Sequence, residues 1–298
     1  MIKRVALFLI TNLGILLVIS LILSIFNVQP YLTQYGLNYQ TLLVYALIVG
    51  FTGSFISLFI SKWMAMHAYN IHLIDRPSNE AEAWLVSEVR RLSGQRNIGM
   101  PDVGIYDSPE PNAFATGWNK NKALVAVSTG LLQTMNKDEL EGVLGHEISH
   151  VANGDMVTLT LIQGVVNTFV IFFARIAAFF VTQFFRRDSD EEGVQGGLVY
   201  YGVAILFELL FGILASMVVM WFSRYREYRA DAGSSKYVGK DKMIKALQRL
   251  QQLTDKTPQD DRAPAFNAMK ISGHHTWLAL FASHPPLEKR IEALEKQR

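Results

Sequence analysis

Long apolar stretches without a charged residue constrain the fold of this chain more than any other feature. The run from Val5 to Phe26 contains no charge and follows Lys3 and Arg4, and the run from Leu42 to Ile60 is closed by Lys62. Each is about as long as the roughly 20 residues that cross a bilayer as a helix. The first run exceeds the apolar region of a usual signal peptide and precedes no small-residue cleavage site, so we expect an uncleaved membrane anchor.

The charges that flank these two runs predict their orientation. Residues 27 to 40 between the runs are polar but uncharged, whereas Lys3, Arg4 and Lys62 lie at the outer ends. Because Lys and Arg are enriched on the cytoplasmic side of membrane proteins, both outer ends are expected in the cytoplasm. Residues 1–62 are therefore predicted to form an N-terminal transmembrane hairpin with a short external connection.

A second pair of apolar runs, Val157 to Phe185 and Leu198 to Phe222, is long enough to span but carries one charge in each run. Arg175 interrupts the first run and Glu208 the second, at equal distances from the connecting segment. Ionisable residues inside a membrane generally face the bundle interior and find partners, so we predict an ion pair across an antiparallel hairpin. The connection between the two runs contains two arginines, which would lie outside if both helices crossed, against the usual charge bias. The alternative is a hairpin that is partly buried in protein or that enters the membrane without crossing.

Between the two pairs lies the motif HEISH, residues 146 to 150, which is typical of a zinc hydrolase. Histidines four residues apart share one helix face, so His146 and His150 can bind one metal ion at about 2.0–2.1 Å. Glu147 projects about 100° around the helix from His146, where its carboxylate can take a proton from a metal-activated water. The alternative is a helix whose polar face carries two histidines by chance, with odds on the order of one in a hundred.

A catalytic zinc ion needs a third protein ligand, and without cysteine this must be His, Asp or Glu. The extended HExxHxxGxxH form is excluded because Met156 occupies the place of its last histidine. Asp155 is the nearest acid, but on a continuing helix it would be turned off the metal face. We favour Glu227, which can ligate from a second helix. Asp231, one turn later, can hold a ligating histidine through its second ring nitrogen.

Together with further stretches, these motifs resemble the HtpX family of membrane-bound zinc endopeptidases and, more distantly, the CAAX prenyl proteases. The matching stretches are PNAFATG at residues 111–117, HEISHVANGD at 146–155, EYRAD at 227–231 and SHPP at 283–286. The resemblance covers nearly the whole chain and implies that His146, His150 and Glu227 bind zinc and that Glu147 is the catalytic glutamate. It also implies a role in membrane-protein quality control in the bacterial inner membrane.

The fold class expected is α+β, with a mainly helical zinc-metallopeptidase domain, a small sheet and transmembrane helices. Residue patterns predict helices over 80–96, from 138 through the zinc motif, through 227–231, over 241–253 and from 287, and strands at 103–106, 113–116 and 124–128. The domain boundaries expected are an N-terminal hairpin at 1–62, metalloprotease segments at 63–156 and 223–298, and the second hairpin at 157–222. Because the proposed ligands flank that second hairpin, the site is expected near the cytoplasmic membrane surface.

Three further positions allow two interpretations each. The stretch from Asn112 to Gly117 is either an ordinary core strand or an edge strand that adds an extended substrate as another strand. His284 is either a surface residue before a Pro-Pro turn or a donor to the oxyanion formed in catalysis. Arg229 either stabilises its helix surface or serves the same oxyanion.

The composition bounds the possible partners. A formal net charge of +2 gives no electrostatic case for nucleic acid, and the absence of cysteine excludes disulfides and thiolate sites. We therefore interpret the chain as an integral-membrane endopeptidase with one zinc ion per subunit, which hydrolyses misfolded or membrane-associated proteins in a lipid bilayer. The alternatives are a narrow-specificity processing protease of the prenyl-protease type and a non-catalytic zinc-stabilised membrane scaffold.

Overall fold

The computed structural model describes residues 36–186, 194–254 and 283–297, together with a few positions before residue 36. The chain divides into two compact units. The first unit comprises Met1–Ser57 and Thr160–Val219, and the second comprises Leu58–Leu159 and Met220–Arg298. The predicted anchor from Val5 to Phe26 lies almost entirely outside the described residues.

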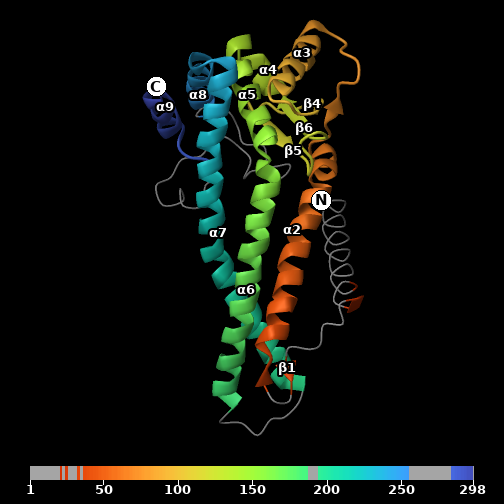
Figure 1. The fold of residues 1–298 in the computed structure, drawn as a ribbon, viewed down its shortest axis with the longest axis vertical. Coiled ribbons are helices and arrows are strands. Elements are labelled where there is room, and N and C mark those ends of the chain that lie inside the picture. Colours follow the sequence, from red (N-terminus) through yellow and green to blue (C-terminus); the bar gives the residue numbers. More distant parts are fainter. Residues whose placement is uncertain are drawn as a thin grey trace. The chain divides into compact units, whose positions relative to one another are not determined.

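Three long helices carry the other apolar runs, namely α2 (Tyr39–Tyr69), α6 (Asp155–Arg186) and α7 (Val194–Val238) (Figure 1). A short antiparallel pair, β1 (Leu32–Thr33) and β2 (Gly36–Leu37), precedes α2. Each helix is long and apolar enough to cross a membrane, yet only 11% of the most apolar 18-residue window of α7 is buried. A water-soluble protein rarely exposes so much apolar surface, whereas in a bilayer such a surface faces hydrocarbon. The exposure favours true membrane spans over a hairpin buried in protein.

Small residues let α2 and α6 approach closely within the first unit. A side chain at Gly50 would collide with the backbone of Thr168, and one at Gly164 would collide with the ring of Phe51. Between helices in lipid, close van der Waals packing of this kind replaces the hydrophobic driving force that water provides elsewhere. The two glycines therefore fix where these helices touch.

The predicted ion pair between Arg175 and Glu208 is confirmed. Arg175 on α6 places its Nη2 atom 3.0 Å from Oε1 of Glu208 on α7. The Arg175 guanidinium also lies over the ring of Tyr201, with its Cζ atom 5.9 Å from the ring centroid. Both charges thus find partners between the two apolar helices, as expected for ionisable groups that are kept away from lipid.

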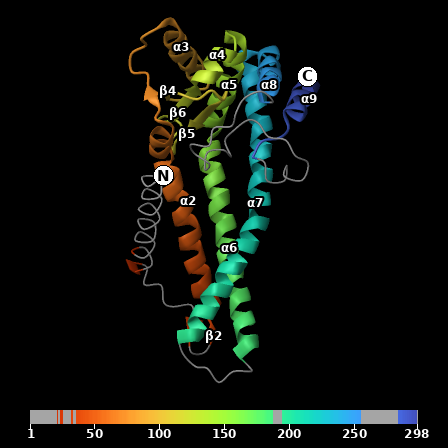
Figure 2. The ribbon, with the colours of Figure 1, turned by 180° about the vertical axis from the view of Figure 1, so that it is seen from behind.

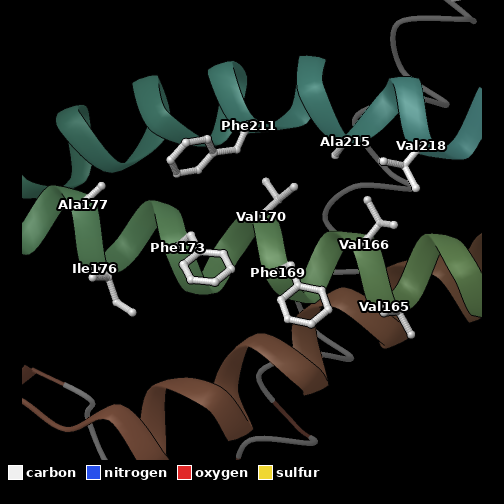
Figure 3. Close-up of a pocket in the computed structure, with 10 residues that line it drawn as sticks. All are labelled: Val165, Val166, Phe169, Val170, Phe173, Ile176, Ala177, Phe211, Ala215 and Val218. Carbon is white, nitrogen blue, oxygen red and sulfur yellow. The ribbon is translucent and has the colours of Figure 1, made fainter.

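An apolar cavity of about 680 Å³ opens between α6 and α7, which lie side by side in both ribbon views (Figures 1 and 2). It is lined by Val165, Val166, Phe169, Val170, Phe173, Ile176, Ala177, Phe211, Ala215 and Val218 (Figure 3). None of these side chains has a polar atom. The cavity is therefore suited to hydrocarbon and not to water or a polar ligand.

The second unit contains a four-stranded mixed sheet in the order β3, β4, β6, β5. The strands are β3 (His72–Leu73), β4 (Asp102–Tyr106), β5 (Ala113–Thr116) and β6 (Leu124–Ser128). β4 and β6 are parallel, with Val103 opposite Val125, and β5 is antiparallel to β6, with Phe114 opposite Ala126. The three predicted strands are present, and β5 ends the sheet within the described residues.

Alternating side chains of the sheet enter two different cores. Among the described residues, the helices that lie wholly within this unit are α3 (Glu80–Gln95), α4 (Thr129–Thr134), α5 (Lys137–Asn153), α8 (Lys240–Thr254) and α9 (Leu287–Lys296). Val125 and its same-face neighbours pack into a core with α3, α5, α8 and α9, in which Leu144 and Leu247 are fully buried. Tyr106 and Phe114 point the other way and pack against Tyr69 at the end of α2. The sheet is thus enclosed on both faces.

Some element bounds differ from the sequence-based expectation, and two differences concern the helices that carry the acidic and histidine motifs. The zinc-motif helix α5 begins at Lys137, one residue earlier than predicted, because Asn136 and Glu139 form a capping box that satisfies two free backbone N–H groups. Residues 222 and 223, between which the predicted domain boundary falls, both belong to α7, which continues through Glu227 and Asp231. The apolar run and the acidic motif therefore share one helix.

A double-mutant cycle tests the Arg175–Glu208 pair. Arg175→Leu or Glu208→Leu alone strands one charge among apolar helices and is expected to cost about 1–3 kcal/mol of stability. The double replacement should cost less than either single change, because no unpaired charge remains. Thermal unfolding in detergent measures the three variants, and simple additivity of the two single effects would show that the side chains do not interact.

Candidate active site

The second unit brings together the three side chains predicted as zinc ligands. His146 and His150 come from α5 and Glu227 comes from α7, and one ligand atom of each lies within 4.8 Å of the others. The two Nε2 atoms are 3.1 Å apart, His146 Nε2 lies 3.3 Å from Glu227 Oε2, and His150 Nε2 lies 3.2 Å from Glu227 Oε1. Three potential ligand atoms therefore converge on one point.

These distances fit a zinc ion. Tetrahedral coordination with bonds of about 2.0–2.1 Å places neighbouring ligand atoms roughly 3.3–3.4 Å apart. The three observed separations lie close to this value, although the donors come from two helices. Two imidazoles and one carboxylate are also the ligand set of many catalytic zinc sites, which keep one position open for water or substrate. The residues present therefore suit a catalytic metal and not a closed structural one.

Each histidine is oriented by a carboxylate on its other ring nitrogen. The Nδ1 atom of His146 lies 2.8 Å from Oδ1 of Asp231, as expected from the sequence, and Nδ1 of His150 lies 2.7 Å from Oδ2 of Asp155. An Nδ1–H group that donates to a carboxylate leaves Nε2 free as the ligand atom and makes it more basic. Both imidazoles are thus held in the orientation that a metal requires.

The role of Asp155 was missed by the sequence-based prediction, which assumed that the zinc helix continues through this residue. In the structure α5 ends at Asn153, and Gly154 adopts the left-handed conformation with φ of 68°. This turn starts a new helix, α6, at Asp155 and brings its carboxylate back to His150. A glycine followed by an aspartate after the last helical turn is the signal that indicates such a break.

Arg290 on α9 is a second residue that the sequence-based prediction missed. Its side chain is fully buried, and its Nε and Nη2 atoms donate to Asp231 at 2.8 and 2.6 Å. Although burial opposes the charged form, the neighbouring carboxylate of Asp231 holds the pKa of Arg290 above its ordinary value. A two-point pair of this kind fixes the orientation of the carboxylate. Arg290 therefore positions Asp231, which in turn positions His146.

Glu147, the predicted base, is buried beside this cluster on α5, with 6% of its surface exposed. Burial raises the pKa of Glu147 above its ordinary value, against the opposite effect of the neighbouring imidazoles of His146 and His150. A carboxylate with a raised pKa is a better proton acceptor near neutral pH. The position and the electrostatics of Glu147 thus both suit general-base chemistry.

The structure places the three remaining candidate positions differently with respect to the site. His284 lies in the site and not at the surface, with its Nδ1 atom 2.7 Å from Oε2 of Glu227. Arg229 is exposed, and at two residues beyond Glu227 it lies on the opposite face of α7, so only its role on the helix surface remains. The stretch from Asn112 to Gly117 contains the edge strand β5, which packs beside the zinc-motif helix α5.

Residues 79–298 match the model of peptidase family M48. A protein of Methylacidiphilum infernorum named Protease HtpX homolog is 52% identical over 299 residues, which cover 99% of both chains. Protease HtpX of Tolumonas auensis is 56% identical over 299 residues, which cover 99% of this chain and all of that protein.

One solved structure has a similar fold. The crystal structure of S. mikatae Ste24p aligns with a TM-score of 0.66 at 19% sequence identity, and the alignment covers 99% of this chain and 64% of that chain. At this level of identity the likeness concerns the fold alone. It confirms the expected α+β architecture, which is mainly helical with a small sheet.

Metal content distinguishes the residues that bind zinc from those that orient the ligands. Glu227→Ala leaves only two imidazoles and should abolish stable zinc binding, whereas Asp231→Asn and Asp155→Asn should weaken it by roughly 10–100-fold. Bound zinc is measured by elemental analysis after titration with a competing chelator. Asp241→Asn, at an exposed position on α8, is the control and should bind zinc normally. Stoichiometric, tightly held zinc in Glu227→Ala would require another third ligand.

Proposed function

Because the chain belongs to peptidase family M48 and is a membrane-bound zinc metalloendopeptidase, we propose that His146, His150 and Glu227 bind the zinc ion and that Glu147 is the catalytic base. The family resemblance drawn from the sequence motifs is confirmed by the full-length relatives. The single observation that best supports the assignment of residues is the convergence of three ligand atoms within 4.8 Å, with Glu147 on the same helix turn.

In the proposed mechanism Glu147 transfers the protons of peptide hydrolysis. A bound zinc ion supplies Lewis acidity, which activates water and polarises the scissile carbonyl. The Glu147 carboxylate takes a proton from the attacking water and delivers it to the nitrogen of the leaving amine. His284 holds the Glu227 carboxylate through its Nδ1 atom, so it positions the proposed third ligand during this cycle.

The substrate is proposed to bind as an extended strand along β5. This edge lies beside α5, which carries the proposed base, and the described part of the sheet ends there. An added strand is held by backbone hydrogen bonds, which do not depend on side-chain identity. Such binding suits a protease with broad specificity.

We propose misfolded or membrane-associated proteins as the substrates, and membrane-protein quality control as the role. Relatives named as HtpX proteases match over the full length at 52–56% identity, which supports this role over that of a narrow-specificity processing protease. A non-catalytic zinc scaffold would have no need of Glu147 and would usually have four protein ligands.

We propose the bacterial inner membrane as the location, with the active site facing the cytoplasm. The support is the charge pattern of the sequence, in which Lys3, Arg4 and Lys62 flank the first two apolar runs on one side. The absence of cysteine agrees with a reducing compartment. In the corresponding domain organisation, the metalloprotease segments 63–156 and 223–298 are interrupted by a spanning hairpin at 157–222.

Replacement of the base tests the mechanism. Glu147→Gln preserves the size and shape of the side chain but cannot accept a proton, so casein cleavage by purified protein should fall by roughly 10² or more. Zinc content should stay at the wild-type level, which separates loss of the base from loss of the metal. Near-normal cleavage by this variant would refute the assignment of Glu147.

Thiol labelling tests the topology, since the chain offers a background without cysteine. Ser87→Cys introduces a thiol at an exposed position of α3, and Ser189→Cys introduces one into the connection between the second pair of apolar runs. A membrane-impermeant reagent should label position 189 in intact spheroplasts and position 87 only in inverted vesicles. Labelling of both positions from the same side would show that the second hairpin does not cross.

A further inference from the structure

Residues 117–122, in the turn that joins β5 to β6, contact the last third of α2. The ring of Trp118 packs edge-on against that of Phe59, with centroids 5.6 Å apart. The Nζ atom of Lys62 donates to the backbone oxygen of Lys122 at 3.2 Å and pairs with Asp102 at 2.6 Å. Phe59 and Lys62 lie where the charge-free run of α2 ends. The turn is thus fixed beside the polar end of a membrane-spanning helix.

The turn has a fixed conformation of its own. Asn119 accepts from the backbone N–H of Asn121 through its side-chain oxygen at 2.8 Å, and its carbonyl accepts from the N–H of Lys122 at 3.0 Å. The side chain of Asn121 accepts from the N–H of Gly99 at 2.8 Å. Gly117 has a φ of 130°, a conformation that a residue with a side chain rarely adopts. The tip is therefore presented in one defined geometry.

The surface of the turn combines exposed aromatic and basic side chains. Trp118 is 47% exposed and Phe59 is 54% exposed, although their rings are in contact. Trp63, one helical turn after Phe59, is 45% exposed, and the side chains of Lys120 and Lys122 are exposed as well. Tryptophan and lysine with this exposure are typical of the boundary between lipid and water, where an apolar body lies among acyl chains and a polar end meets headgroups.

We propose that residues 117–122, together with the exposed Phe59 and Trp63 of α2, bind the surface of the bilayer. The indole of Trp118 enters the interface beside Phe59, and the ammonium groups of Lys120 and Lys122 bind the phosphates of acidic phospholipids. Charge complementarity favours acidic lipids as the partner, since both lysines lie at the tip and surface lysines are attracted to anionic headgroups. This lipid contact is independent of the proposed catalytic roles, and its test does not depend on proteolysis.

Depth-dependent quenching measures the contact directly. In full-length protein, Trp118→Cys is labelled with a bimane probe, whose aromatic ring stands in for the indole, and is reconstituted into vesicles of phosphatidylcholine with an equal amount of phosphatidylglycerol. Brominated lipids are expected to quench this probe several-fold more than the same probe at Ala81→Cys, an exposed control on α3. Aqueous iodide should show the reverse order.

Charge reversal tests the choice of lipid. Lys120→Glu combined with Lys122→Glu should reduce quenching by brominated lipid at position 118 in the acidic vesicles to the level found in pure phosphatidylcholine. Lys245→Glu, at an exposed position on α8, is the matched control and should leave quenching unchanged. Equal iodide quenching at positions 118 and 81 would overturn the proposal. So would protection of the probe at position 118 from iodide that depends on protein concentration in lipid-free detergent. The second outcome would identify another copy of the chain as the occupant.

Discussion

The Asp231 carboxylate connects the parts of the second unit on which the active site depends. It is carried by α7, it orients His146 on α5, and it is held at two points by Arg290 on α9. A buried carboxylate is costly unless it is paired and hydrogen-bonded, and here both oxygens have partners. Loss of any one member would leave a buried charge without its partner, which usually destabilises more than replacement of the whole group. The geometry of the proposed metal ligands and the stability of the fold are therefore linked at this residue.

Much of the arrangement follows from regular helix geometry and could be predicted from the sequence. The four-residue spacing of His146 and His150 placed both imidazoles on one face, and the same spacing placed Asp231 one turn after Glu227. Equal distances from the connecting segment placed Arg175 and Glu208 at one level of the antiparallel pair. Each of these predictions needed only the pitch of a helix and the cost of an unpaired charge.

Other features depend on tertiary structure and were not predicted. Asp155 reaches His150 only because Gly154 ends one helix and starts another, so an extrapolated helix placed it wrongly. Arg290 lies 59 residues from Asp231 on a short helix whose sequence resembles an ordinary amphipathic surface helix. No local pattern distinguishes an arginine that will be fully buried from one that will be solvated. The pairing partner appears only when the second unit has folded.

If substrate binds along β5 as proposed, the length of this edge limits how firmly a polypeptide can be held. In an antiparallel pair, alternate residues direct their N–H and C=O groups toward the same neighbouring strand. β5 has four residues, and some of these direct their backbone groups toward β6. About two residues therefore direct their backbone groups toward an incoming chain. A short free edge also offers little template for pairing between copies of the protein, which is how many natural sheets avoid aggregation. On this proposal, weak and brief binding favours chains that are already extended over stably folded neighbours in the same membrane.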